Sequence, residues 1–106
     1  MTDQAGVQRA LQSAPQSDAD LLAAFAAGDR GAAMVLTQRL TPRVMGQAYR
    51  MLGNRAGAED VAQDAMMRLW KIAADWDPDR AQITTWLYRV VANLCTDRLR
   101  KSGRAV

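Results

Sequence analysis

Histidine is absent from this sequence of 106 residues, and cysteine occurs only once, as Cys95. A single cysteine cannot form a disulfide within the chain, and the usual zinc site of cysteines and histidines cannot be assembled. Enzymes most often use histidine as their general base, so acid–base catalysis would have to rely on carboxylates and lysines. We therefore expect a non-enzymatic protein without a metal or other cofactor, working in a reducing cytoplasm.

The sequence also lacks any apolar run close to the ~20 residues that span a bilayer. Its N-terminus has neither the basic start nor the apolar stretch of a secretory signal, so export and membrane insertion are not expected. The composition is 49% hydrophobic and 24% charged, which is apolar enough for one buried core. We expect a single folded domain.

Positive and negative charges are distributed unevenly, although the net charge is only +3. Residues 1–57 contain six arginines and four aspartates, for a charge of +2, whereas residues 58–79 contain six acids and two bases, for a charge of −4. Residues 80–106 contain six bases and one acid, for a charge of +5. An acidic middle and a basic end indicate two different partners, with nucleic acid as the candidate for the basic end. The alternative is that both blocks are simply solvated helix faces.

Apolar residues recur at the helical period of about 3.6 residues along most of the chain, and no strand-like alternation or internal repeat is found. The pattern predicts helices over residues 18–27, 30–52, 56–74 and 82–101. Pro42 interrupts the second stretch, which is therefore either one kinked helix or two helices, with Thr41 capping the later one. The predicted fold class is all-α, a compact bundle of four to five helices.

Small and polar residues mark the start of the helical region. Ser17 followed by Asp20 resembles a capping box and opens the first helix, which Gly28 ends. The residues before Ser17 show only weak periodicity. The predicted organisation is a flexible leader of residues 1–16, a helical domain of residues 17–102 and a tail of residues 103–106.

The third predicted helix carries a polar face opposite its apolar one. At about 100° per residue, the following side chains lie opposite the core stripe: Asp60, Gln63, Asp64, Met67 and Lys71. Two acids one turn apart repel each other, although proximity to the helix N-terminus offsets part of that repulsion through the helix dipole. One explanation of the acids is therefore a preference for helix starts. The other is a docking face for a protein, with Met67 as an adaptable apolar contact.

The last predicted helix has an outer stripe that is basic, amide-bearing and aromatic. The stripe consists of Trp86, Arg89, Asn93, Thr96 and Arg100. Guanidinium groups bind phosphates, an asparagine side chain can pair with a base edge, and an aromatic ring offers a stacking platform. The stripe therefore predicts a nucleic-acid contact. The alternative is that Trp86 closes the bundle against Trp70 and that the arginines are only solvated.

The segment DWDPDRA, residues 75–81, is predicted to be a loop because it combines a proline with three aspartates and an exposed tryptophan. Single-stranded nucleic acid is commonly read by extruding a base into a pocket between a loop and a neighbouring helix. Side chains suited to the rim of such a pocket are Trp76, Asp77, Arg80 and Gln82. A calcium loop is not supported, because the segment lacks the glycine and the terminal glutamate of an EF-hand.

Residues 58–70 (AEDVAQDAMMRLW), the acidic loop and residues 85–101 (TWLYRVVANLCTDRLRK) together resemble region two of extracytoplasmic-function (ECF) sigma factors of the sigma-70 family. The resemblance extends back to Ser17 and covers about 85 of the 106 residues. It implies the sigma region-two fold and a role in transcription initiation. In that role, the domain binds the RNA polymerase core and recognises and melts the minus-ten promoter element as single-stranded non-template DNA. Binding energy alone can hold the opened strand, so no nucleotide or metal is needed.

The resemblance also implies which residues bind each partner. The clamp helices of the largest polymerase subunit would be bound by Asp60, Gln63, Asp64 and Met67. Promoter DNA would be bound by Trp76, Asp77, Arg80, Trp86, Arg89, Asn93, Arg100 and Lys101. Many ECF relatives are held inactive by an anti-sigma protein, which adds such a protein to the expected partners.

Two features depart from the family pattern. Region four, the helix-turn-helix that reads the minus-thirty-five element, has no counterpart. We therefore expect residues 103–106 to begin a linker to an absent region four, in an excised domain or a truncated relative. The aromatic cluster with which housekeeping sigma factors wedge the duplex is reduced to Trp86 and Tyr88. A second hypothesis is accordingly a helical adaptor, or sigma mimic, that docks on the polymerase clamp without reading DNA.

Overall fold

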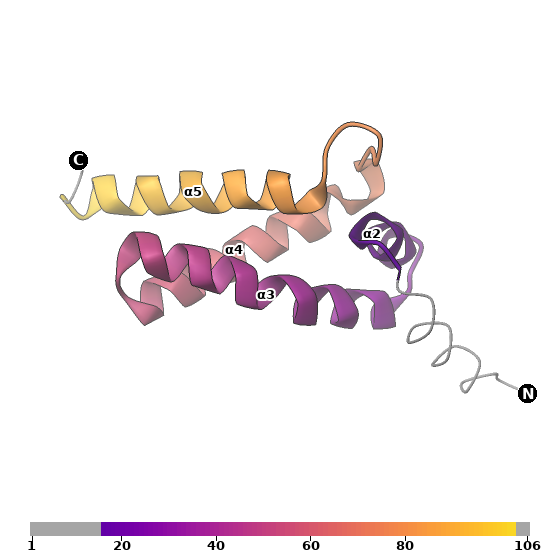
Figure 1. Cartoon of the computed structure of the whole chain (residues 1–106), viewed down its shortest axis with the longest axis horizontal. Helices are drawn as coiled ribbons and strands as arrows, with labels where there is room; N and C mark the ends of the chain where they lie inside the picture. The colour runs from indigo at the N-terminus through magenta and orange to yellow at the C-terminus, as the bar shows by residue number, and fades with distance from the viewer. Residues whose placement is uncertain (1–15, 104–106) are drawn as a thin grey trace, which may run out of the picture.

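The computed structural model describes residues 16–103. In that range the elements are α2 (Asp18–Ala26), α3 (Arg30–Leu52), α4 (Arg55–Ile72), the 3₁₀ turn η1 (Ala73–Asp75) and α5 (Ile83–Lys101) (Figure 1). No β-strand occurs among these residues. The predicted all-α bundle of four to five helices is confirmed, and the predicted helix boundaries differ from the observed ones by two residues at most. Of the predicted leader and tail, only Gln16 and Gly103 lie within the described part of the chain.

Local hydrogen bonds and glycine conformations set the ends of the first two helices. The Ser17 hydroxyl accepts a hydrogen bond from the backbone N–H of Asp20 at 3.0 Å and so starts α2, as predicted. Gly28 (φ 107°) follows α2 and Gly53 (φ 68°) follows α3, both in the left-handed region that glycine adopts without strain. These glycines therefore allow the sharp changes of direction between consecutive helices.

Pro42 lies inside α3, which is one continuous helix of 23 residues. Leu40 and Val44 on either side of the proline are both fully buried, so the apolar face of the helix continues through this position. Packing on both sides keeps the helix intact although one backbone donor is missing. Of the two predicted alternatives the single helix is correct, and Thr41 does not cap a separate helix.

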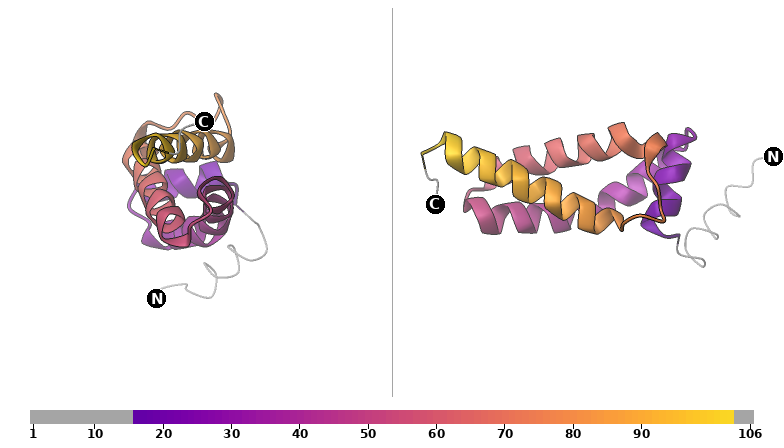
Figure 2. Two further views of the ribbon diagram at one scale, coloured as in Figure 1. Left: turned by 90° about the vertical axis from the view of Figure 1, so that its left-hand side faces the viewer. Right: turned by 90° about the horizontal axis from the view of Figure 1, so that it is seen from above.

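The three long helices lie lengthwise, and the short α2 packs across one end of the bundle next to η1 (Figures 1 and 2). α3 contacts each of the other three helices. α5 runs from the loop after η1 back along the bundle and ends beside the turn between α3 and α4 (Figure 1). The loop and the start of α5 therefore share one end of the molecule with α2, whereas the last turn of α5 lies at the other end.

The core is formed by apolar side chains that recur mainly every fourth residue along α3 and α5. The large side chains that are fully buried are Leu21, Leu22, Leu36, Leu40, Val44, Leu69, Leu87, Val91 and Cys95. Burying a leucine or valine side chain stabilises a fold by roughly 1.5–3 kcal/mol relative to leaving it exposed. No charged or polar side chain is buried among residues 16–103, so this core is purely apolar.

Among the described residues, no helix combines the length and the apolar character required to cross a membrane.

Candidate functional site

α4 turns one side to the core and leaves the opposite side exposed. Its start is fixed by Asn54, whose side-chain oxygen accepts a hydrogen bond from the backbone N–H of Gly57 at 2.9 Å. On the inner side Val61, Ala65 and Leu69 are buried. The side chains predicted to bind a protein are all exposed, as the helical projection predicted, and we call them the acidic face: Asp60, Gln63, Asp64 and Met67.

The acids of this face do not serve the start of the helix. α4 begins at Arg55 and has no acidic residue in its first turn. Asp60 and Asp64 lie beyond that turn, where the influence of the helix dipole has faded. The explanation of these acids as a helix-start preference is therefore wrong, because Asn54 provides the cap instead.

Both carboxylates of the acidic face are paired within the molecule. Oδ1 of Asp64 lies 3.2 Å from Nε of Arg68, one turn further along α4. Oδ2 of Asp60 lies 3.4 Å from Nη2 of Arg98, which belongs to α5. All four side chains are about half exposed, so the pairs contribute little to stability and leave the acids accessible to a partner.

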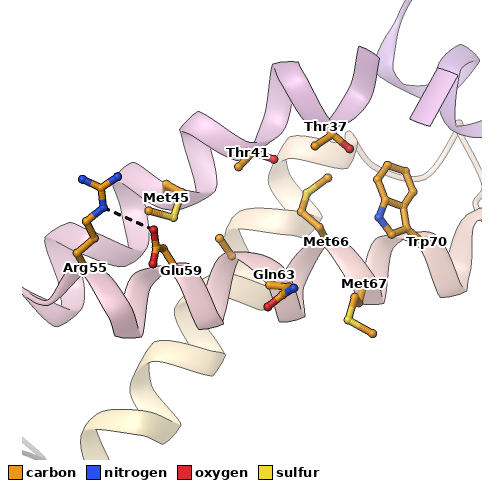
Figure 3. A pocket seen from close by; sticks show the side chains of 10 residues that line it. Thr37, Thr41, Met45, Arg55, Glu59, Gln63, Met66, Met67 and Trp70 are labelled. Carbon is orange, nitrogen blue, oxygen red and sulfur yellow. Dashed lines mark ion pairs between the residues drawn. The ribbon is translucent and has the colours of Figure 1, made fainter. Parts of the chain in front are cut away.

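A groove of about 730 Å³ lies beside the acidic face, between α3 and α4 (Figure 3). Gln63 and Met67 line it as well as belonging to the acidic face. An exposed ion pair between Arg55 and Glu59, with 3.5 Å between Nε and Oε2, closes one end (Figure 3). The full lining consists of Thr37, Thr41, Met45, Arg55, Glu59, Ala62, Gln63, Met66, Met67 and Trp70.

Sequence reasoning missed three large apolar residues of this groove, namely Met45, Met66 and Trp70. Each occupies a helix position that is equally compatible with a core role, and only the packing of α3 against α4 brings the three together. The concentration of methionines was the available signal, since flexible thioether side chains are common at surfaces that adapt to a partner. The groove therefore places an apolar surface directly beside the acidic face.

α5 exposes a second polar face. Its inner residues Leu87, Val91 and Cys95 are buried. The exposed side chains that were predicted to bind nucleic acid are defined here as the basic face: Arg89, Asn93, Arg100 and Lys101. Thr96, from the predicted stripe, is exposed as well. Because α5 has 19 residues and is therefore about 28 Å long, the basic face is an extended track rather than a pocket.

The cations near the end of α5 also have a structural role. The last turn contains Arg98, Arg100 and Lys101. Positive charges at this position complement the negative end of the helix dipole, so they stabilise α5 whether or not they bind a partner.

Trp76 and Trp86 pack against each other at the start of α5, with ring centroids 5.9 Å apart and an edge-to-face angle of 77°. Both are half-buried and rest on the core. Two sequence interpretations are therefore wrong, because Trp76 is not fully exposed and Trp86 does not pack against Trp70. The ring partner of Trp70 is Phe25, at 4.8 Å. The loop that joins η1 to α5 brings Trp76 and Trp86 together.

The rest of the loop is exposed and is held by a local turn. The Asp77 carboxylate accepts a hydrogen bond from the backbone N–H of Asp79 at 3.0 Å, and its carbonyl accepts one from the N–H of Arg80 at 3.2 Å. Nε of Arg80 also lies 4.0 Å from the Asp77 carboxylate. Gln82 is exposed and precedes α5 without a side-chain capping bond. The turn therefore keeps Asp77 and Arg80 at the surface.

The fold and the two faces define a class: a small all-helical module that presents different polar surfaces on separate helices. In residues 16–103 no group of three or more acidic, cysteine or histidine side chains is placed to hold a metal ion. Comparison with known proteins then gives the family. Residues 36–105 match the family model described as Sigma-70 region 2.

Several ECF RNA polymerase sigma factors are similar to this chain. SigW of Bacillus subtilis is 39% identical over 74 residues, which are 70% of this chain and 39% of that protein. SigM of Mycobacterium tuberculosis is 39% identical over 87 residues, which are 82% of this chain and 44% of that protein. RpoE of Cereibacter sphaeroides is 36% identical over 73 residues, which are 69% of this chain and 40% of that protein.

The chain belongs to the sigma-70 family and contains its region 2 domain. It spans about two fifths of the length of the curated relatives it matches. These relatives are ECF RNA polymerase sigma factors. The predicted family is therefore confirmed.

Proposed function

We propose that this chain acts in transcription initiation by binding the RNA polymerase core and holding the minus-ten promoter element as single-stranded non-template DNA. The observation that carries the proposal is that the acidic face and the basic face lie on different helices and are both exposed. A protein and a DNA strand can therefore be bound at the same time.

The acidic face fits a helical partner that offers basic and apolar side chains. Asp60 and Asp64 are one turn apart, so both can pair with arginines or lysines on a neighbouring helix. Met67 and the groove beside it can take apolar side chains of the same partner. The proposed partner is the pair of clamp helices of the largest polymerase subunit.

The basic face and the loop fit a single DNA strand. Arg89, Arg100 and Lys101 can neutralise phosphates, and Asn93 can pair with a base edge. The exposed parts of Trp76 and Trp86, with Asp77 and Arg80 beside them in sequence, offer a surface for an unstacked base. This binding energy becomes available only after base pairs open, so it favours melting without hydrolysis.

Membership of the sigma-70 family supports a cellular location and one further partner as parts of the proposal. We place the activity in the cytoplasm, where RNA polymerase works, and include an anti-sigma protein that covers the two faces among the partners. Residues 17–102 are the proposed functional domain. Residues 1–16 are the proposed leader, and residues 103–106 the proposed tail.

A helical adaptor that binds polymerase without reading DNA is the second candidate function. It is favoured by one observation, namely that the cations in the last turn of α5 already have a role in stabilising that helix. Under this alternative only the acidic face would contact a partner.

Substitutions on each face separate the two candidates. Asp64→Lys places a positive charge opposite basic partner side chains and is expected to weaken binding to core polymerase by at least about tenfold. Arg89→Ala combined with Asn93→Ala should leave that binding unchanged. The same double change should weaken binding of the polymerase complex to a minus-ten oligonucleotide by about tenfold or more, because Asn93 loses a base-edge contact worth about 1–3 kcal/mol and Arg89 loses a phosphate contact.

The matched control is Asp20→Lys, a charge reversal at an exposed position of α2, which should leave both affinities close to those of the wild type. If the double change leaves oligonucleotide binding untouched, the strand-reading role is wrong and the adaptor is favoured. If Asp64→Lys binds core polymerase normally, the acidic face is not the docking surface.

A further inference from the structure

We propose that Met67 is an oxidant-sensitive modification site, and that its conversion to methionine sulfoxide by hydrogen peroxide weakens docking to core polymerase. The effect on docking rests on the function proposed above, whereas the oxidation depends on this chain alone. The sequence contains six methionines, and three of them line the groove between α3 and α4, namely Met45, Met66 and Met67. Half of the methionines therefore lie at or beside the surface assigned to the polymerase.

The three methionines of the groove differ in their access to solvent. Met67 is 53% exposed, whereas Met66, its neighbour in the chain, is only 7% exposed. Met66 points from α4 toward α3, and Met67 points away from α3 (Figure 3). Met45 is partly buried against the core. Because oxidation of a side chain requires access, a small oxidant in solution reaches Met67 before the other two.

The single thiol of the chain does not compete with Met67 for the oxidant. Cys95 is fully buried, and burial raises the pKa of its thiol, so little of the reactive thiolate forms at neutral pH. No second cysteine is present to form a disulfide with it. Within residues 16–103 the sulfur that an oxidant can reach at the surface is therefore that of methionine.

The reaction is a two-electron oxidation of the Met67 thioether. The sulfur donates a lone pair to one oxygen of hydrogen peroxide, and the S–O bond forms as the O–O bond breaks. The departing hydroxide takes the proton of the transferred oxygen and leaves as water. Sulfur is thus oxidised and the peroxide reduced. Methionine sulfoxide reductases restore the thioether, so the change is reversible.

A sulfoxide at position 67 opposes docking because it changes an apolar contact into a polar one. Met67 lies at the groove beside Met66 and Trp70, where the partner is proposed to place apolar side chains. Docking removes water from this surface, and a polar oxygen that loses its water without gaining a hydrogen-bond donor opposes burial. We expect oxidation to weaken binding to core polymerase about tenfold.

Tandem mass spectrometry of the full chain after brief treatment with hydrogen peroxide tests the oxidation step. Met67 should gain oxygen well before Met66, as should Met34, which is 65% exposed and lies outside the groove. Circular dichroism of the treated chain checks that its helices are intact. If Met66 in the folded chain is oxidised as fast as Met67, the assignment of Met67 as the reactive site is overturned.

The affinity for core polymerase before and after treatment tests the effect on docking, with catalase added to remove the peroxide before the polymerase is introduced. Binding of the wild type should weaken about tenfold on treatment and recover after reduction of the sulfoxide. Each variant is compared with its own untreated form. Met67→Leu should lose little affinity on treatment, because leucine has no sulfur. Met34→Leu is the matched control and should lose as much as the wild type.

A polar side chain introduced without any oxidant gives an independent test. Met67→Gln places an amide of similar length at the same position and should weaken polymerase binding about tenfold. Met34→Gln makes the same change at an exposed position outside the groove and should leave the affinity close to that of the wild type. Equal affinities for these two variants would contradict the role of Met67.

Failure of this site and failure of the proposed function are distinguishable. If treatment does not weaken binding of the wild type, or if Met67→Leu loses as much affinity as the wild type, docking does not respond to oxidation of Met67. If the untreated wild type does not bind core polymerase, the proposed function is overturned together with the effect on docking. The order in which Met66 and Met67 are oxidised still decides whether Met67 is the reactive site.

Discussion

Cys95 provides the only thiol of the chain and lies fully buried on the inner side of α5. Burial raises the pKa of this thiol because the thiolate loses its solvation, while the positive charge of Arg98 acts in the opposite direction. The thiol is therefore protonated at neutral pH and behaves as a small apolar core side chain, not as a nucleophile.

The raised pKa of Cys95 predicts a loss of stability at high pH. Above about 8.5, the ordinary pKa of a thiol, the unfolded chain loses the proton while the folded chain keeps it, so rising pH favours unfolding. Below that pH both states keep the proton, and the contribution is fully present. Urea unfolding between about pH 8 and about pH 10 should show a steeper decline for the wild type than for Cys95→Ala. Equal slopes for the two proteins would contradict the assignment.

At the residue scale, the sequence predicts which side of a helix a residue occupies but not which distant residue it contacts. The exposure of Asp64 and Asn93 follows directly from the helical period. The contact between Asp60 and Arg98 joins residues 38 positions apart, and no local pattern signals it. The half-burial of Trp76 was missed for the same reason, because it depends on the contacts of this residue with Trp86 and with the core.

At the scale of elements, α4 depends on a single cap. Asn54 accepts the hydrogen bond of Gly57, and neither acid of the acidic face contributes to the helix start. This cap fixes the first turn of the helix that carries the acidic face, so it contributes to the site as well as to the fold.

Asn54→Ala should therefore lower the free energy of unfolding by about 1 kcal/mol, because one backbone N–H of α4 loses its partner. Gln82 occupies the corresponding position before α5 but makes no side-chain capping bond, so Gln82→Ala is the matched control. The control should have a much smaller effect in urea unfolding monitored by circular dichroism. Similar losses for both variants would show that the Asn54 hydrogen bond is not the cause.

The elements themselves were the most predictable part of the molecule. Ser17 and Gly28 mark the limits of α2 through local chemistry that depends only on neighbouring residues. For Pro42 the sequence left open whether one helix or two would form, because the proline is known to remove only one backbone hydrogen bond. Whether the helix continues depends on the tertiary packing of Leu40 and Val44. The end of the third predicted helix is the 3₁₀ turn η1 and not a continuation of α4. The spacing of apolar residues does not distinguish these two conformations.

At the scale of the whole molecule, the bundle holds its two polar surfaces on different helices. α3 packs against both α4 and α5, so it holds the acidic face and the basic face in a fixed relation. The groove between α3 and α4 and the ion pair between α4 and α5 are both products of this packing. Neither could be predicted from one helix at a time, although the family resemblance correctly predicted the fold that produces them.

The most direct test of the central claim, that two macromolecules are bound at once, is retention of the chain by core polymerase with and without fork-junction DNA at increasing salt. We predict that polymerase alone retains the chain and that the complex binds the DNA more tightly than polymerase without the chain. The affinity should fall as salt rises, with a logarithmic slope of about 0.7 for each phosphate contacted on a single strand. If polymerase retains the chain but the chain adds no salt-dependent affinity for DNA, the claim that the chain binds two macromolecules at once is contradicted.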